Sequence, residues 1–468
     1  MFRGWNTMDL LLLDRGVVGA LTGALEELAT LVAIPSVAAQ ATTGAPMEPC
    51  AQAVAALLRT RGLEARITPT AGGPPVVFAE DRSAGVDAPT VLFYNHYDVQ
   101  PAEPFDLWES DPWTLRVDGD HAFARGVSDD KGHIVCRLMA LDALRAANGG
   151  RLPVNIKWVI EGEEEVSSIH LPAWIEANAA VLDADVCIWE FGGVDEGGHP
   201  EIVCGLRGIA CFELHARTIA YDAHSGVGGS LLPNAAWRLV QALGTLKDHD
   251  EHILIPGYYD AVVPADDADK ALLAALPNTA KTEAYLKREF GVTEFLGGAT
   301  GVEYERRQVF EPTITINGLS SGYQGAGSKT VLPAHAMAKL DLRLVPDQDP
   351  DWVRQALRSH LDSHGFTDVE LVYLGGQRPA RVDPKHPMVR LALDTARAVY
   401  DAPPSLFPLV GVSGPFYPFA VTLGLPIVTI GCGYPGARVH SPNENLRLSD
   451  LVRGAKHTAR FIAALAAG

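Results

Sequence analysis

The stretch VLFYNHYDVQPAE, residues 91–103, ends an apolar run with two titratable side chains, His96 and Asp98. Side chains alternate between the two faces of a strand, so His96 and Asp98 share one face and Tyr97 points to the other. Ligands of open α/β sheets gather at the carboxyl ends of the strands. Most His-x-Asp pairs only make ordinary hydrogen bonds, so the meaning of this one depends on what the rest of the chain adds.

The surrounding pattern predicts an α/β fold with an insertion. TVLFYNHYDV, VNIKWVIEG and ADVCIWEF are typical of buried strands, and HIVCRLMALDALRAANGG predicts a helix. From about Arg207 the alternation becomes cleaner, as in IACFELHART and MAKLDLRLV, with helical stretches near 231–246 and 351–364. The α/β pattern then returns with a helix near 386–400, the strand LPIVTIGCG and a last helix from about 448.

A chain of 468 residues is too long for one ordinary core. We therefore predict a mostly parallel α/β domain formed by residues 1–206 and 378–468, with an α+β domain, residues 207–377, inserted into it.

Composition excludes several classes of protein. The net charge of −19 argues against a nucleic-acid partner, which needs a basic face. No apolar run is long enough for a signal peptide or a membrane span. The six cysteines form no CxxC pair, which favours reduced thiols in a cytoplasmic protein.

Four further segments place polar side chains where strands or turns end. They are ARGVSDDKGH (124–133), VIEGEEEVSS (159–168), CIWEFGG (187–193) and ARVHSPNENL (437–446). Each has an ordinary explanation, such as a helix N-cap or a solvated acidic loop. Together with residues 91–103, however, they gather two histidines and several carboxylates at one edge of one sheet. Because so many acids would repel one another, we expect a pair of divalent cations there, with zinc first and manganese second.

In this order, HxD, SDDKG, EGxEE, a lone acid after a strand and HSPNE resemble the co-catalytic zinc peptidase family. That family includes carboxypeptidase G, aminoacylase, succinyl-diaminopimelate desuccinylase and carnosinase-type dipeptidases. The resemblance runs through nearly the whole chain. It implies a dinuclear-metal α/β catalytic domain with an inserted lid domain that forms a homodimer.

The resemblance also implies a role for each site residue. His96 and Glu190 would bind one ion, His440 and Glu165 the other, and Asp129 would bridge the two. Asp98 would orient the imidazole of His96, and Glu164 would be the general base. The peptide bond after Asp129 is expected to be cis.

Three inserted segments resemble the carnosinase-type dipeptidases: YDAHSGVGGS (221–230), KTVLP (329–333) and LDLRLVP (340–346). The resemblance implies that His224 of one subunit stabilises the oxyanion in the other subunit, with Thr330 as a second contact in trans. Arg343 would hold the terminal carboxylate of the substrate. A surface histidine and a strand-edge salt bridge are the ordinary alternatives for His224 and Arg343.

One turn departs from the dipeptidase pattern. LVGVSGPFYPF (409–419) retains Ser413 as a substrate contact, but Val412 replaces a glycine and an Arg-Glu pair is missing. We expect a dinuclear metallodipeptidase that cleaves dipeptides with a free C-terminal carboxylate. The alternative is an N-acyl-amino-acid deacylase. A relative that only binds peptides is more remote, because every expected ligand and Glu164 are present.

Overall fold

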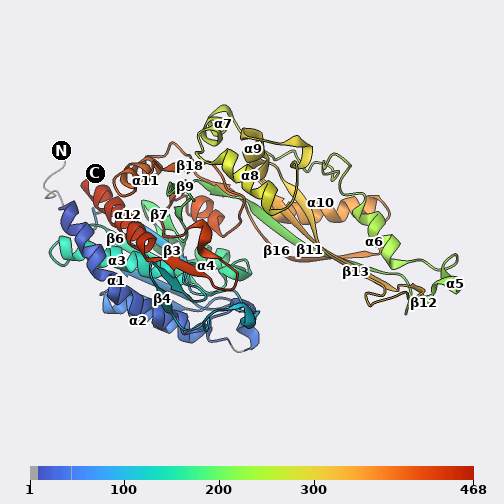
Figure 1. Ribbon diagram of the computed structural model, residues 1–468, viewed down its shortest axis with the longest axis horizontal. Coiled ribbons are helices and arrows are strands. Elements are labelled where there is room, and N and C mark those ends of the chain that lie inside the picture. The colour runs from blue at the N-terminus through green and yellow to red at the C-terminus, as the bar shows by residue number, and fades with distance from the viewer. Residues whose placement is uncertain (1–8, 44) are drawn as a thin grey trace.

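The structure, a computed structural model, describes residues 9–43 and 45–468. An α/β unit lies at one end and a second sheet with its helices projects from it (Figure 1). The predicted segment 207–377 contains that second sheet, and its division from the rest as a domain stays a prediction. In the described part of the chain, no helix is long and apolar enough to cross a membrane.

A six-stranded sheet forms the centre of the α/β unit. Its order is β1-β2-β6-β3-β7-β19. Strands β6, β3, β7 and β19 are parallel, and the hairpin β1–β2 joins β6 antiparallel. This confirms the predicted mostly parallel sheet. The strands are β1 Glu64–Thr68, β2 Val76–Asp81, β3 Thr90–His96, β6 Asn155–Glu161, β7 Val186–Trp189 and β19 Ile427–Thr429.

Both faces of this sheet are covered, which explains its nearly continuous apolar strands. Val91 and Phe93 of β3 belong to the core on one face, whereas Leu92 and Tyr94 belong to the core on the other. Tyr97 packs with Phe93, as the alternation predicts. The first face is covered by α1 Leu10–Val32, α2 Met47–Thr60, α3 Lys131–Ala147, α11 Pro387–Arg397 and α12 Leu448–Ala467. The second is covered by α4 Leu171–Leu182 and η5 Pro418–Thr422.

The second sheet is antiparallel and is covered by helices on one face only. Its order is β13-β15-β11-β16. Along β11, Phe212 and Leu214 are buried against α6 and α10, whereas Glu213 and His215 are half-buried on the opposite, open face. The elements are β11 Gly208–Arg217, β13 Thr313–Ser321, β15 His335–Leu344, β16 Val369–Gln377, α6 Ala235–Leu243 and α10 Pro350–Ser363.

Three further helices, α7 Asp267–Ala274, α8 Thr279–Glu289 and α9 Val302–Phe310, stand between the two sheets. The sequence pattern did not predict these helices. Arg207, just before β11, donates to the carbonyls of Gln308 and Glu311 and so ties this group to the second sheet. Arg381 joins it to the α/β unit through a salt bridge to Asp269.

Short elements complete the fold. They are β4 Arg116–Asp118, β5 His121–Phe123, β8 Gly193–Val194, β9 Pro200–Val203, β10 Gly205–Leu206, β12 Ala223–His224, β14 Val331–Leu332, β17 Ala380–Arg381, β18 Ser405–Phe407, β20 Asn445–Arg447 and α5 Ser225–Gly228, and the 3₁₀ turns η1 Ala38–Thr43, η2 Phe105–Leu107, η3 Glu164–Val166, η4 Leu296–Gly298 and η6 Pro435–Ala437. Strands β12 and β14 form a separate two-stranded sheet. With helix α5 they lie beyond the end of the second sheet, at the tip farthest from the α/β unit (Figure 1).

Candidate metal centre

The polar segments identified in the sequence converge at the carboxyl edge of the parallel strands. His96 is the last residue of β3, and Asp129 precedes α3. Glu165 lies in η3, directly after β6, and Glu190 follows β7. His440 comes from the loop after η6. The topology thus brings to one edge side chains that are separated by more than 300 residues.

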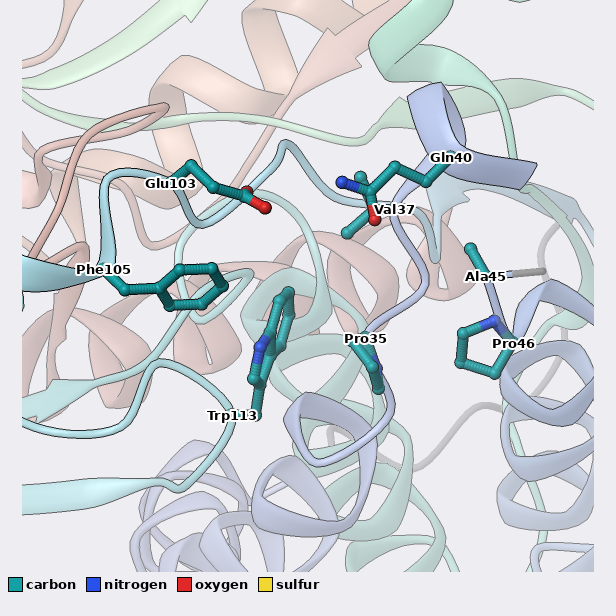
Figure 2. A pocket seen from close by; sticks show the side chains of 8 residues that line it. All are labelled: Pro35, Val37, Gln40, Ala45, Pro46, Glu103, Phe105 and Trp113. Atoms are coloured by element: carbon teal, nitrogen blue, oxygen red, sulfur yellow. The ribbon is translucent and has the colours of Figure 1, made fainter. Parts of the chain in front are cut away.

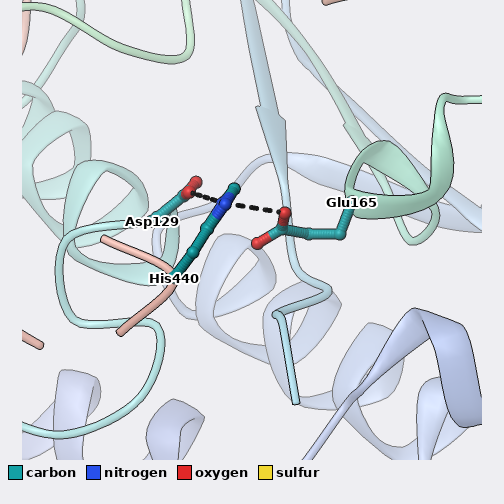
Figure 3. A group of neighbouring side chains, drawn as sticks. All are labelled: Asp129, Glu165 and His440. Carbon is teal, nitrogen blue, oxygen red and sulfur yellow. Dashed lines mark hydrogen bonds and ion pairs between the residues drawn. The ribbon is translucent and has the colours of Figure 1, made fainter. Parts of the chain in front are cut away.

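Asp129 lies between the two histidines. Its Oδ1 is 3.0 Å from His96 Nε2, and its Oδ2 is 3.0 Å from His440 Nε2. His440 Nε2 is also 3.1 Å from Glu165 Oε2 (Figure 3). The peptide bond between Asp129 and Asp130 is cis, as expected. A carboxylate that offers one oxygen to each side has the geometry required of a bridging ligand.

The ligand atoms around His440 lie closer together than those around His96. Asp129, Glu165 and His440 each place one ligand atom within 4.8 Å of the others, and this is the one such group of three found in the described residues. His96 lies on the other side of Asp129, and Glu190 is not part of the closed group. Glu190 is nevertheless buried, and its Oε2 has no hydrogen-bond partner in the described part of the chain.

Asp98 contacts His96 and the backbone of Glu164 and Glu165. His96 Nδ1 lies 3.1 Å from the Asp98 carbonyl oxygen and 3.3 Å from its carboxylate Oδ1. The same carboxylate accepts hydrogen bonds from the backbone N–H groups of Glu164 and Glu165, at 3.2 and 3.0 Å. Asp98 therefore orients the imidazole and also fixes the start of η3.

The structure separates the four glutamates of residues 161–165 by role. Glu161 is buried and accepts from the hydroxyl groups of Tyr94 and Ser168, at 2.6 and 2.9 Å. Glu163 lies 2.9 Å from His170 Nδ1 and also accepts from the His170 backbone N–H. Only Glu164 and Glu165 are left facing the cluster.

The charges at this edge favour a cation. Burial, with the nearby carboxylates of Glu165 and Asp129, raises the pKa of Glu164. Burial, followed by the charge of Glu164, raises the pKa of Glu190. Hydrogen bonds with Asp129 and Glu165 raise the pKa of His440 to about 10. Burial is the largest cause of the Glu164 and Glu190 shifts, and neighbouring carboxylates raise both pKa values further, so a cation at this edge would offset both effects.

The donor set therefore fits divalent metal ions. It consists of two imidazoles and several carboxylates, the ligands that zinc and manganese accept. Glu165 Oε1 and Glu190 Oε2 are buried without hydrogen-bond partners, although buried polar atoms are rarely left unpaired. A cation at each would satisfy both atoms.

Two acids that the sequence analysis left without a role hold this site in place. Glu444 is fully buried and accepts hydrogen bonds from Arg125 Nη1 at 2.7 Å and from three backbone N–H groups, those of Gly126, Ser128 and Asp129. Its position within the quoted segment HSPNE was the only signal for it in the sequence.

Asp130 has a comparable supporting role. Its side chain does not cap α3. Instead it accepts from Asn95 Nδ2 at 2.6 Å and from the His96 backbone N–H at 3.1 Å. This explains why two acids stand next to each other before the helix: Asp129 faces the cluster and Asp130 fixes the end of β3.

Arg343 and Ser413, predicted to contact substrate, lie together. Arg343 Nη1 donates to Ser413 Oγ at 3.1 Å. The next residue, Gly414, is beside the cluster, because a Cβ atom there would lie 3.6 Å from Glu164 Oε1 and 3.8 Å from Glu190 Oε1. A basic side chain and a hydroxyl thus reach the neighbourhood of Glu164 from the second sheet and from the 409–419 turn.

His224 and Thr330 are not part of this assembly. His224 is in β12, opposite Val331 of β14, at the tip of the second sheet (Figure 1). The His224 Nδ1 atom accepts a hydrogen bond from the Gly226 backbone N–H at 3.0 Å. The side chains of His224 and Thr330 are both exposed. Within one chain, neither residue reaches the metal cluster.

A separate cavity of about 300 Å³ lies on the α/β unit (Figure 2). Pro35, Phe105 and Trp113 are among its mainly apolar walls, and Glu103 and Gln40 supply polar atoms. None of its lining residues belongs to the predicted site, so this cavity is distinct from the metal cluster.

Comparison with known proteins finds metallodipeptidases and dipeptidases among the relatives of this chain. The chain is 31% identical over 424 residues to the Cys-Gly metallodipeptidase DUG1 of Saccharomyces cerevisiae, covering 84% of this chain and 83% of that protein. It is 29% identical over 402 residues to the mouse Beta-Ala-His dipeptidase, covering 83% of this chain and 79% of that protein.

Solved structures agree. An M20 family metallo-carboxypeptidase from Sulfolobus solfataricus matches with a TM-score of 0.88 and 34% identity, over 95% of this chain and 99% of that one. Human carnosine dipeptidase 1 matches with a TM-score of 0.77 and 28% identity, over 98% and 100%. The profile of peptidase family M20/M25/M40 matches residues 92–464, a stretch that includes every side chain of the cluster. Fold, strand-end ligands and sequence thus lead to one assignment: this chain belongs to peptidase family M20/M25/M40 and is a hydrolytic metallopeptidase.

Proposed function

We propose that this protein is a dinuclear metallodipeptidase that cleaves the amide bond of dipeptides with a free C-terminal carboxylate. The observation that carries the proposal is Asp129, whose two carboxylate oxygens each lie 3.0 Å from a different imidazole. Beside it, Glu165 Oε1 and Glu190 Oε2 are buried without a hydrogen-bond partner among the described residues. The curated relatives named above are dipeptidases, which supports the substrate class.

His96 and Glu190 would hold one ion, His440 and Glu165 the other, and Asp129 would join them. Zinc suits this donor set best and manganese is the second choice. Two such ions, when bound, polarise the scissile carbonyl and acidify the attacking water.

Glu164 would be the general base. Among the four glutamates of residues 161–165, Glu164 is the one whose carboxylate has no hydrogen bond or ion pair with a described residue, whereas Glu165 contacts His440 and Gln100. A raised pKa suits a group that takes a proton from water and passes it to the leaving amine. Asp98 would keep His96 and the start of η3 in place during this transfer.

Arg343 and Ser413 would bind the C-terminal carboxylate of the substrate. A guanidinium binds a carboxylate through two parallel hydrogen bonds, and Ser413 already orients one of its nitrogens. Asp341 lies 3.3 Å from Arg343 Nε and orients the other side of the guanidinium. Val412, exposed in the same turn, would border this end of the substrate.

We further propose a homodimer formed through residues 207–377, which serve as a lid. His224 and Thr330 would then enter the active site of the partner subunit, where His224 would stabilise the oxyanion. Large apolar side chains near His224 in the sequence are exposed, which supports a partner at this tip: Tyr221 80%, Val227 74% and Leu231 81%. All six cysteines are free, which supports a reducing, cytoplasmic location.

A carboxypeptidase acting on longer peptides is the second candidate, because the archaeal relative carries that activity in its name and the same Arg343 anchor would serve it. The test is a substrate panel with zinc or manganese: dipeptides, the same dipeptides amidated at the C-terminus, tri- and tetrapeptides, and N-acetyl and N-succinyl amino acids. We expect fast turnover of free dipeptides. Preferred turnover of N-acyl amino acids would favour a deacylase instead.

A further inference from the structure

Two histidines lie together on the open face of the second sheet, away from the metal cluster. His215 is on β11 and His335 on the neighbouring strand β15. The Nδ1 atom of His215 is 3.3 Å from the Nε2 atom of His335, and the two rings are stacked with centroids 5.5 Å apart. Both side chains are only half-buried, so the pair can be reached by solvent ions.

Glu213 fixes which nitrogen of His215 is free. Its Oε2 is 2.9 Å from His215 Nε2, and its Oε1 is 3.1 Å from Lys339 Nζ. Because the Glu213 carboxylate accepts a hydrogen bond from Nε2–H, the proton of a neutral His215 is on Nε2 and the lone pair is on Nδ1, the atom that faces His335.

We propose that His215 and His335 form a binding site for one divalent ion of the zinc type, with water completing the coordination. Two imidazole nitrogens bound at about 2.05 Å to a tetrahedral zinc lie about 3.3 Å apart, which is the separation found here. Glu213 supplies the carboxylate that metal-ligating histidines commonly hold at their second nitrogen. In the described part of the chain, Nδ1 of His335 has no hydrogen-bond partner, so this ring is free to carry its proton there.

The site is independent of the catalytic cluster. Arg343 is eight residues farther along β15 on the same face, which corresponds to about 27 Å of strand. Across the strands, His335 is paired with Arg217 and His215 with Glu370. The positive charge of Arg217 and the negative charge of Glu370 thus flank the two histidines, in addition to those of Lys339 and Glu213. Because these charges balance, we expect the site to bind its ion reversibly and without high affinity.

The competing explanation is a plain N–H···N hydrogen bond between the rings, and zinc titration separates the two. Full-length protein is first saturated at its catalytic sites, and further zinc uptake is then measured by equilibrium dialysis. We expect the wild-type protein to take up one more ion than a His215→Gln/His335→Gln variant. Glu213→Gln should weaken this uptake by about tenfold, because it removes the charged partner of His215. Cu²⁺ as a second probe should show an electron paramagnetic resonance signal with two nitrogen couplings that the double variant lacks.

His364→Gln is the matched control. The ring centroids of His364 and His360 are 4.3 Å apart. However, His364 Nδ1 lies 2.9 Å from the His360 carbonyl oxygen, and His360 Nε2 lies 3.0 Å from the Thr245 carbonyl oxygen. This pair offers no two facing nitrogens, so zinc uptake should be unchanged.

A measurement on the wild-type protein covers the case in which a variant fails to fold. Zinc should protect His215 and His335 from diethyl pyrocarbonate, as mapped by mass spectrometry, and leave His249, whose side chain is 89% exposed, fully reactive. Equal uptake by the wild-type protein and the folded double variant, or labelling of the pair that zinc does not change, would overturn the proposal.

Discussion

Replacing Glu164 by Gln tests the proposed mechanism most directly. Gln keeps the volume and most contacts of the side chain but cannot accept a proton from water. The side chain is beside Gly414, next to Glu190, and the Glu164 backbone N–H is held by Asp98 at 3.2 Å, so the loop should stay in place. Loss of a general base lowers rates about 10²–10⁴-fold, or about 2.7–5.5 kcal/mol in barrier height.

The adjacent Glu163→Gln variant is the matched control. Glu163 is buried and engages the His170 ring and backbone, so its loss should lower the free energy of unfolding by about 1.5–3 kcal/mol while kcat changes little. The assay compares kcat, bound metal by mass spectrometry and thermal unfolding for both variants. The reasoning is refuted if folded, metal-replete Glu164→Gln turns over at nearly the wild-type rate, or if Glu163→Gln loses as much activity.

Four other changes have defined outcomes. Chelation should lower the unfolding temperature in calorimetry and zinc should restore it, since an ion at 100 times its Kd stabilises the folded state by about 2.7 kcal/mol. His96→Ala and His440→Ala should each lose one of two bound ions in elemental analysis. Arg343→Ala should reduce kcat/KM for free dipeptides by an amount equivalent to about 1.5–3 kcal/mol and spare amidated ones. Glu164→Ala and His224→Ala subunits, each inactive alone, should recover about a quarter of wild-type activity once exchanged into mixed dimers.

For each of these four predictions, one experimental result would contradict the reasoning. An unchanged unfolding temperature after complete chelation would mean that metal does not stabilise the fold. A single ion in the saturated wild-type protein would exclude a dinuclear centre. Equal losses on free and amidated dipeptides would make Arg343 structural. Fully exchanged mixtures that stay inactive, or a monomer by light scattering, would remove the role of His224 in trans.

The sequence predicted the α/β sheet because its strands are buried on both faces and therefore carry long apolar runs. It also predicted that His96, Asp129, Glu165 and Glu190 meet, since each follows a strand or precedes a helix at the same edge. The helices α7, α8 and α9 were not predicted. For α8 there is a physical reason: none of its residues is buried, so the apolar stripe that marks a packed helix is absent.

Interactions that depend on register or on distant partners could not be predicted. His215 and His335 are neighbours only because β11 pairs with β15 in one particular register, with His215 opposite Met337. The four acceptor contacts of Glu444 involve residues 315–319 positions away. Neither arrangement leaves a periodic signal in the local sequence.

Glu444 also resolves a difficulty that the chain's organisation creates. The residues of the cluster that come before and after residues 207–377 lie about 3 Å from one another although a whole sheet is inserted between them. The buried Arg125–Glu444 pair, 2.7 Å apart, and the bonds from Glu444 to the backbone of Gly126, Ser128 and Asp129 join the two parts directly. Strand β20 pairs with β5 at the same place. None of these contacts involves the second sheet, so His440 is held beside Asp129 within the α/β unit itself.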